Sequence, residues 1–124
     1  MAHILIAEDD EFNQIVTEDI LKLLFPGTTT VIADNGQEAL ERLSEEKFDL
    51  VLSDVDMPLV DGYELVRRIK NELKLEMPII CITAFAISGD REKLLMHGFD
   101  AYISKPVDID EIRSVLGRYL GSEA

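Results

Sequence analysis

Acidic side chains follow two of the short apolar runs in this 124-residue chain. The acidic run Glu8–Asp10 comes directly after Ile4–Ala7, and Asp54 comes shortly after Leu50–Leu52. Two carboxylates about 4 Å apart repel each other by roughly 4 kcal/mol at an effective dielectric of about 20. A hard divalent cation such as Mg²⁺, which takes oxygen ligands, removes that repulsion. Because an aspartate beside such a cation can attack phosphorus, the pattern favours phosphoryl transfer to a carboxylate.

A hydroxyl and an amine follow two further apolar runs. Thr83 comes directly after Ile79–Ile82, and Lys105 follows Ala101–Ile103 after one residue. Groups of these types bind the remaining oxygens of a phosphoryl group. Each residue alone has an ordinary interpretation, as part of a solvated acidic turn, as a β-branched strand residue or as a surface lysine. Their shared position after apolar runs favours a site that makes and holds an aspartyl phosphate.

The elements that must position these residues alternate along the chain. Short apolar runs, most of them rich in Ile and Val, are typical of strands buried on both faces of a parallel sheet. There are five such runs: Ile4–Ala7, Val31–Ala33, Leu50–Leu52, Ile79–Ile82 and Ala101–Ile103. Between and after them lie stretches with helical spacing. The alternation predicts an α/β fold, a doubly wound parallel sheet with right-handed crossovers.

The helical stretches carry apolar stripes and start signals. The first stripe consists of Phe12, Ile15, Val16, Ile20, Leu23 and Leu24. Asn35 is placed to cap the second helix, and Asp108 with Glu111 has the spacing of a capping box at the start of the fifth. In an open sheet of this kind ligands bind at the carboxyl ends of the strands. The acidic run, Asp54, Thr83 and Lys105 are therefore expected to share one edge of the sheet.

Length and composition restrict the function further. The length corresponds to one domain, residues 1–124, with no output domain expected. The net charge of −13 argues against nucleic acid or an anionic membrane as a partner, since both require a basic surface. The single cysteine, Cys81, fits a reducing compartment, and the opening residues lack the basic segment of a signal peptide. We expect a cytoplasmic protein without a membrane span.

The chain resembles the receiver domain of two-component response regulators over nearly its whole length. The resemblance rests on four segments, of which the second has the specific pattern Asp-x-x-Met-Pro-x-x-x-Gly: Ile4–Asp9, Asp54–Gly62, Ile82–Ala84 and Tyr102–Pro106. It implies a flavodoxin-like (βα)5 fold with strand order 2-1-3-4-5. It also implies a phospho-accepting signalling protein that catalyses its own phosphorylation and dephosphorylation, not an enzyme with a separate substrate.

The resemblance assigns a role to each residue of the site. Asp54 takes a phosphoryl group from a phosphohistidine on a histidine kinase or a histidine phosphotransfer domain, and Lys105 binds that group. Mg²⁺ is the implied cofactor, held by Glu8, Asp9, Asp54 and the backbone carbonyl of Asp56. The family has Asp more often where this chain has Glu8, and the longer side chain could act through water.

The resemblance also implies a conformational switch. Thr83 supplies the switch hydroxyl, Tyr102 is the aromatic switch residue, and the Lys105-Pro106 bond is expected to be cis. Phosphorylation is expected to change the face formed by the fourth helix, the fifth strand and the fifth helix, where a downstream protein binds. Two stretches, Asp9–Gln14 and Gly89–Lys93, look like those of receivers in hybrid kinases and phosphorelays.

Two alternatives remain open on the sequence. Asp54 and Asp56 have the Asp-x-Asp spacing of haloacid-dehalogenase-type phosphatases, although Pro58 stands where that family has a hydroxyl and the chain is too short for a cap domain. The other alternative is a pseudo-receiver that binds a partner without being phosphorylated. The complete set of site residues argues against it.

Overall fold

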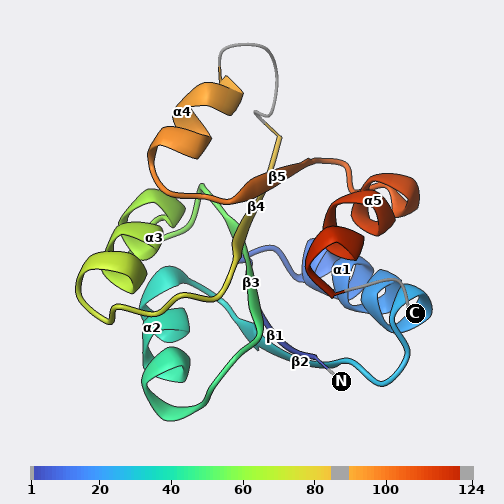
Figure 1. Cartoon of the computed structure of the whole chain (residues 1–124), viewed down its shortest axis with the longest axis horizontal. Helices are drawn as coiled ribbons and strands as arrows, with labels where there is room; N and C mark the ends of the chain where they lie inside the picture. Colours follow the sequence, from blue (N-terminus) through green and yellow to red (C-terminus); the bar gives the residue numbers. More distant parts are fainter. Residues whose placement is uncertain (1, 85–89, 121–124) are drawn as a thin grey trace.

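The computed structural model describes residues 2–84 and 90–120 as five parallel strands, each followed by a helix (Figure 1). The elements are β1 His3–Ala7, α1 Glu11–Leu24, β2 Thr29–Ala33, α2 Gly36–Glu45, β3 Leu50–Asp54, α3 Gly62–Asn71, β4 Ile79–Thr83, α4 Asp90–Met96, β5 Ala101–Ser104 and α5 Ile109–Leu120. The sheet has the order β2-β1-β3-β4-β5. This is the predicted flavodoxin-like topology. Of the sequence landmarks above, Gly89 lies outside the described residues.

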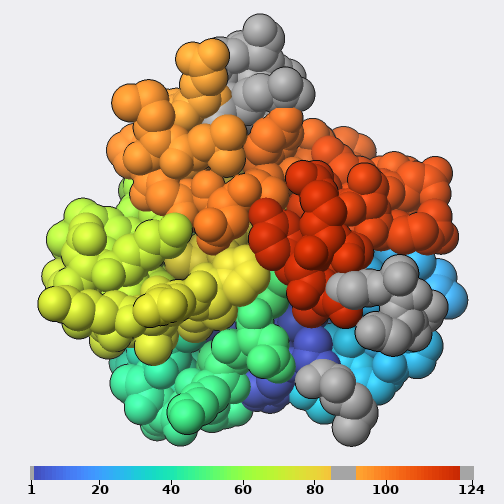
Figure 2. Space-filling model, viewed as in Figure 1, coloured from blue at the N-terminus to red at the C-terminus, as the bar shows by residue number. Residues whose placement is uncertain are grey.

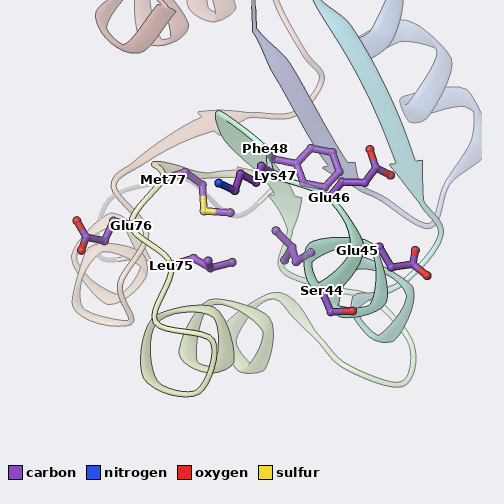
Figure 3. Close-up of a pocket in the computed structure, with 9 residues that line it drawn as sticks. Ser44, Glu45, Glu46, Lys47, Phe48, Leu75, Glu76 and Met77 are labelled. Atoms are coloured by element: carbon purple, nitrogen blue, oxygen red, sulfur yellow. The ribbon is translucent and has the colours of Figure 1, made fainter.

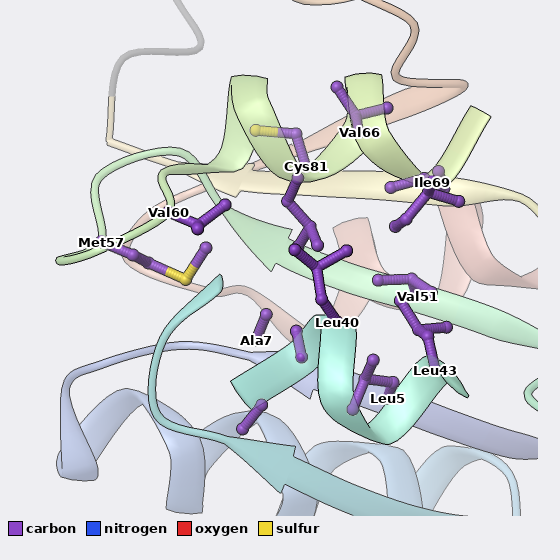
Figure 4. Close-up of a cluster of buried hydrophobic side chains, with 14 of the residues drawn as sticks. Leu5, Ala7, Leu40, Leu43, Val51, Met57, Val60, Val66, Ile69 and Cys81 are labelled. Carbon is purple, nitrogen blue, oxygen red and sulfur yellow. The ribbon is translucent and has the colours of Figure 1, made fainter. Parts of the chain in front are cut away.

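Helices cover both faces of the sheet. Figure 1 shows α1 and α5 on one side and α2, α3 and α4 on the other. Two apolar clusters fill the spaces between. The first cluster joins the sheet to α2 and α3 through residues such as Leu40 and Val66 (Figure 4). Leu94 of α4 belongs to the same cluster. The second cluster joins the sheet to α1 and α5 through Leu21 and Ile112. The sheet therefore separates two cores.

The strands extend beyond the apolar runs at their polar ends. β3 includes Ser53 and Asp54, and β4 includes Thr83, because all three pair in register with the neighbouring strand. β3 and β4 are buried along their whole length, as predicted. The prediction of burial on both faces is wrong for β2 and β5, which are partly exposed because they lie at the two edges of the sheet.

The face of α1 that meets the core differs from the predicted apolar stripe. Phe12, Ile15 and Leu23 are 72%, 50% and 66% exposed. The buried residues of the helix are Gln14, Thr17 and Leu21. Gln14 can be buried because its side-chain amide donates two hydrogen bonds to neighbouring loops. Ile20 and Leu24 of the predicted stripe pack against the second cluster, so the helix keeps part of the predicted face and is rotated relative to the rest.

Side-chain caps begin the helices as the sequence predicted. Asn35 Oδ1 accepts a hydrogen bond from the Glu38 N–H at 2.8 Å, and Asp108 Oδ2 accepts one from the Glu111 N–H at 3.1 Å. The Glu111 carboxylate accepts from the backbone N–H of Ser104 at 3.0 Å. That bond joins the start of α5 to the end of β5, so Glu111 orients the segment that carries Lys105.

Candidate functional site

Three carboxylates meet at the carboxyl edge of the sheet. Glu8 and Asp9 follow β1, Asp54 ends β3, and one oxygen from each lies within 4.8 Å of the others. Glu8 and Asp54 are 4% and 7% exposed, whereas Asp9 is exposed. The strand register places Glu8 beside Asp54, because Ala7 pairs with Ser53 and these two acidic residues directly follow that pair in the chain. The donor set consists of oxygen only and suits Mg²⁺.

Lys105 bridges two of these carboxylates. Its Nζ lies 2.8 Å from Glu8 Oε1 and 2.9 Å from Asp54 Oδ2. Its backbone N–H donates to the Thr83 carbonyl at 2.9 Å, and the Lys105-Pro106 peptide bond is cis, as expected. The Glu8 side chain is long enough to reach the ammonium group directly. The site is therefore a compact cluster of one ammonium group and three carboxylates.

The two oxygens of Asp54 have different neighbours. Oδ1 accepts hydrogen bonds from the backbone N–H groups of Val55 at 2.7 Å and Asp56 at 3.4 Å. Oδ2 accepts from Lys105. The Ser53 hydroxyl donates to the Asp54 carbonyl at 2.8 Å, which fixes the backbone at the strand end. Asp54 is thus held in one orientation by groups on both sides of its carboxylate.

Burial and charge shift the proton affinities within the cluster. Burial raises the pKa of Glu8, although the hydrogen bonds from Lys105 and the Asp10 N–H oppose the rise. Burial alone would lower the pKa of Lys105, but its hydrogen bonds to Glu8 and Asp54 outweigh that effect and raise it. Lys105 therefore remains a cation, and it offsets part of the repulsion that the sequence predicted among the carboxylates.

The remaining predicted site residues surround this cluster. Thr83 ends β4 and is 1% exposed, and its register partner on β5 is Ser104. Tyr102 is partly buried against the first apolar cluster. Asp56 is exposed, and its backbone N–H, not its carboxylate, contacts Asp54. An acid that acts beside Asp54, as the phosphatase alternative requires, is thus not supplied by Asp56 in this structure.

Three residues near the site were not singled out for this role from the sequence. Gln14 and Asp34 connect the loops after β1 and β2 through a hydrogen bond of 2.8 Å. Gly62 packs against the backbone of Asp54. A glutamine in a helix carries no signal of burial, and an aspartate directly before the helix cap Asn35 is typical of a turn. The close packing of the glycine depends on the position of a strand distant in sequence.

A cavity of about 510 Å³ lies at the other end of the sheet. Its lining comes from the end of α2 and the loops that lead into β3 and β4, with Leu43, Phe48, Leu75 and Met77 as its apolar part (Figure 3). None of the predicted site residues lines it.

Within the described residues no helix is long and apolar enough to cross a membrane.

Comparisons with known proteins show the family of the chain. The family model of the response regulator receiver domain matches residues 4–117. The polar-differentiation response regulator DivK of Brucella anthropi is 36% identical over 119 residues, which make up 95% of each chain. The receiver domain of the Pseudomonas aeruginosa sensor histidine kinase PA1611, with a magnesium ion coordinated in its active site cleft, matches with a TM-score of 0.84 and 35% identity over 98% of both chains.

A second solved structure gives the same result. The receiver domain of a signal transduction histidine kinase from Syntrophus aciditrophicus has a TM-score of 0.85 and 34% identity, over 99% of this chain and 92% of that one. The matches therefore include both a response regulator and receivers of histidine kinases. Family model, sequence relatives and strand order all agree, and the chain belongs to the response regulator receiver domain family of two-component signalling.

Proposed function

We propose that this receiver accepts a phosphoryl group on Asp54. The observation that carries the proposal is the position of the Asp54 carboxylate, which shares the Lys105 ammonium with Glu8 and lies within 4.8 Å of carboxylate oxygens of Glu8 and Asp9. Its side chain is 9% exposed, so a donor reaches it only from the carboxyl edge of the sheet. The backbone N–H groups at Oδ1 and the ammonium at Oδ2 hold the carboxylate in a fixed orientation.

The residues present fit Mg²⁺ as the cofactor. Glu8, Asp9 and Asp54 bring three carboxylate oxygens within 4.8 Å of one another, and oxygen ligands are those Mg²⁺ prefers. The backbone carbonyl of Asp56 is the proposed fourth protein ligand. A bound Mg²⁺ supplies positive charge that neutralises phosphoryl oxygens as they approach the carboxylates.

The transfer itself requires little from the protein beyond position and charge. A carboxylate oxygen of Asp54 forms a bond to phosphorus while the bond from phosphorus to the donor histidine nitrogen breaks. The nitrogen leaves with the bonding electron pair. Lys105 moves from its two carboxylate partners to an oxygen of the new phosphoryl group. Donors of this chemistry are histidine kinases and histidine phosphotransfer proteins.

Thr83 and Tyr102 are the proposed switch. Tyr102 pairs in register with Cys81, and side chains two residues apart on a strand share a face, so Thr83 and Tyr102 point to the same side of the sheet. That side is the one covered by α4, whose Leu94 belongs to the same apolar cluster as Cys81. Movement of the Thr83 hydroxyl toward phosphoryl oxygens would leave space into which Tyr102 turns.

A downstream protein would read this change on the face formed by α4, β5 and α5. Figure 2 shows the surface of α4 adjoining that of the segment from β5 to α5. Leu95 of α4 is 46% exposed, so this helix has an apolar side chain available for a partner. The cytoplasmic location expected from the sequence stays a prediction.

Intact mass measurement tests phosphorylation directly. The protein is incubated with acetyl phosphate, with and without Mg²⁺, as wild type, Asp54→Asn and the control Asp19→Asn, which removes an exposed carboxylate of α1. We expect one Mg²⁺-dependent phosphoryl adduct in wild type and the control and none in Asp54→Asn. An adduct that persists in Asp54→Asn would contradict the proposed acceptor. If no adduct forms with acetyl phosphate or with a phosphorylated histidine phosphotransfer domain as donor, the result would favour the pseudo-receiver.

The switch needs a separate experiment. Thr83→Ala removes the hydroxyl, and Thr30→Ala in β2 is the matched control at a distance from the site. We expect Thr83→Ala to be phosphorylated but to lose the spectral changes of α4 and β5 amides that accompany phosphorylation in the wild type. Equal changes in Thr83→Ala and wild type would show that Thr83 does not couple the site to this face.

A further inference from the structure

The side chain of Gln14 joins two loops beside the carboxylates. It lies in the first turns of α1 and the residue is only 9% exposed. Its Nε2 donates to the Glu8 carbonyl at 2.6 Å and to Asp34 Oδ1 at 2.8 Å. Its backbone N–H donates to the Asp10 carbonyl at 3.0 Å. Gln14 therefore holds the Glu8–Asp10 turn at both ends.

We propose that Gln14 is a positioning residue for the cation site: it fixes the backbone of the turn that carries Glu8 and Asp9. The inference rests on the proposed Mg²⁺ site at these residues. Asp9 is exposed, and its side chain forms no hydrogen bond or ion pair with the other described residues, so its position depends on the backbone around it. The Glu8 N–H donates to the Ala33 carbonyl at 3.0 Å, and Gln14 supplies the second attachment, at the Glu8 carbonyl.

The chemistry of the side chain suits this position. The nitrogen of a primary amide carries two N–H groups, so it can donate to a carbonyl and to a carboxylate at the same time. A carboxylate in its place could not donate at all. The amide is neutral, so it holds the turn without the positive charge by which a lysine would repel a cation. The Asp34 carboxylate keeps the amide oriented from the side of β2. Partners that orient metal ligands in this way have measurable effects on metal affinity.

Titration with Mg²⁺ alone, followed by backbone amide resonances, tests the proposal. Gln14→Met keeps the length of the side chain and removes both N–H groups. Gln37→Met, at an exposed position on α2, is the matched control. We expect Gln14→Met to raise the Mg²⁺ dissociation constant about tenfold, and the control to leave it unchanged. Phosphorylation of Gln14→Met by acetyl phosphate should require more Mg²⁺ and reach the wild-type rate at saturation.

A purely structural role would give a different result. It would lower the rate at saturating Mg²⁺ and leave the dissociation constant unchanged, and this outcome would overturn the proposal. The wild type gives a second readout that does not depend on a variant folding: the side-chain amide resonance of Gln14 should shift along the Mg²⁺ titration, while that of Gln37 should not. A Gln14 resonance that stays fixed at saturation would also overturn it. If wild type binds no Mg²⁺, the proposed cation site fails, and the inference fails with it.

Discussion

A Cβ atom added at Gly62 would lie 2.3 Å from the backbone carbonyl oxygen of Asp54. The N–H of Gly62 also donates to the Val55 carbonyl at 2.7 Å, so α3 begins in direct contact with the end of β3. In the sequence this glycine ends the Asp-x-x-Met-Pro-x-x-x-Gly pattern, which carries no information on its packing, and a turn at the start of a helix explains its residue type equally well. In the structure its lack of a side chain lets the helix approach the proposed phosphoacceptor closely.

Gly62→Ala should therefore displace Asp54 as well as destabilise the fold. We expect a loss of about 1 to 3 kcal/mol in the free energy of unfolding, as in overpacked cores. Urea unfolding measures the loss, and the mass assay should show slower adduct formation. Gly117→Ala is the control, because nothing lies within 4 Å of an added Cβ at that position in α5. There the helix propensity of alanine should stabilise by up to about 1 kcal/mol.

Removal of the Lys105 ammonium should have opposite effects on metal binding and phosphorylation. A unit charge about 5 Å from a divalent cation is repelled by roughly 1.7 kcal/mol even in water, so Lys105→Met should bind Mg²⁺ up to about tenfold more tightly. Its adduct formation should be slower because the phosphoryl oxygens lose a partner. Lys47→Met makes the same charge change at the other end of the sheet and should alter neither. Weaker Mg²⁺ binding in Lys105→Met would contradict the repulsion argument.

Two leucines of α1 distinguish the buried face seen in the structure from the buried face that the apolar spacing predicted. Leu21 is fully buried and Leu23 is 66% exposed. Leu21→Ala should cost about 2 to 5 kcal/mol of unfolding free energy, and Leu23→Ala under about 0.5 kcal/mol. Chemical denaturation measures the free energy of unfolding of both variants. Similar losses of stability in the two would mean that the predicted apolar stripe faces the core.

The buried thiol of Cys81 should make stability depend on alkaline pH. Burial raises its pKa from 9.0 to about 12, so above pH 9 the unfolded chain loses a proton that the folded chain keeps. The contribution of the protonated thiol to the free energy of unfolding is complete below pH 9 and is lost as the pH rises toward 12. The stability difference between wild type and Cys81→Ala should shrink by about 1 kcal/mol between pH 9 and pH 10. A constant difference in urea unfolding over that range would contradict the shift.

The meeting of Glu8, Asp9, Asp54 and Lys105 at one edge could be expected from the sequence pattern, whereas the strand order was implied by the family resemblance. Apolar runs identify buried parallel strands, and the ends of such strands meet at one edge. The prediction that Lys105 lies near Asp54 is confirmed by a distance of 2.9 Å. The contact between Lys105 and Glu8 was not predicted. Whether a glutamate side chain is long enough to make it depends on how far the ends of β1 and β5 lie from each other along the strand direction.

The orientation of α1 could not be predicted for a related reason. Its apolar residues form a regular stripe, and nothing in the spacing shows that Gln14 and Thr17 lie inward instead. Burial of a glutamine depends on acceptors supplied by two other loops, after β1 and β2. Such tertiary hydrogen bonds are absent from any local pattern. The roles of Thr83 and Tyr102 stay predictions, since they concern a second state of the protein.

The cavity between the end of α2 and the loop before β4 offers a place for a covalent reporter. Ser44 on its rim is exposed, and its hydroxyl donates only locally, to the Glu41 carbonyl at 2.7 Å. Cys81 is the single cysteine of the chain and is fully buried, with a raised pKa that disfavours the reactive thiolate. A Ser44→Cys variant would therefore carry one labelling site. A dye attached there would report on the protein without occupying the edge of the sheet that carries the proposed phosphoryl site.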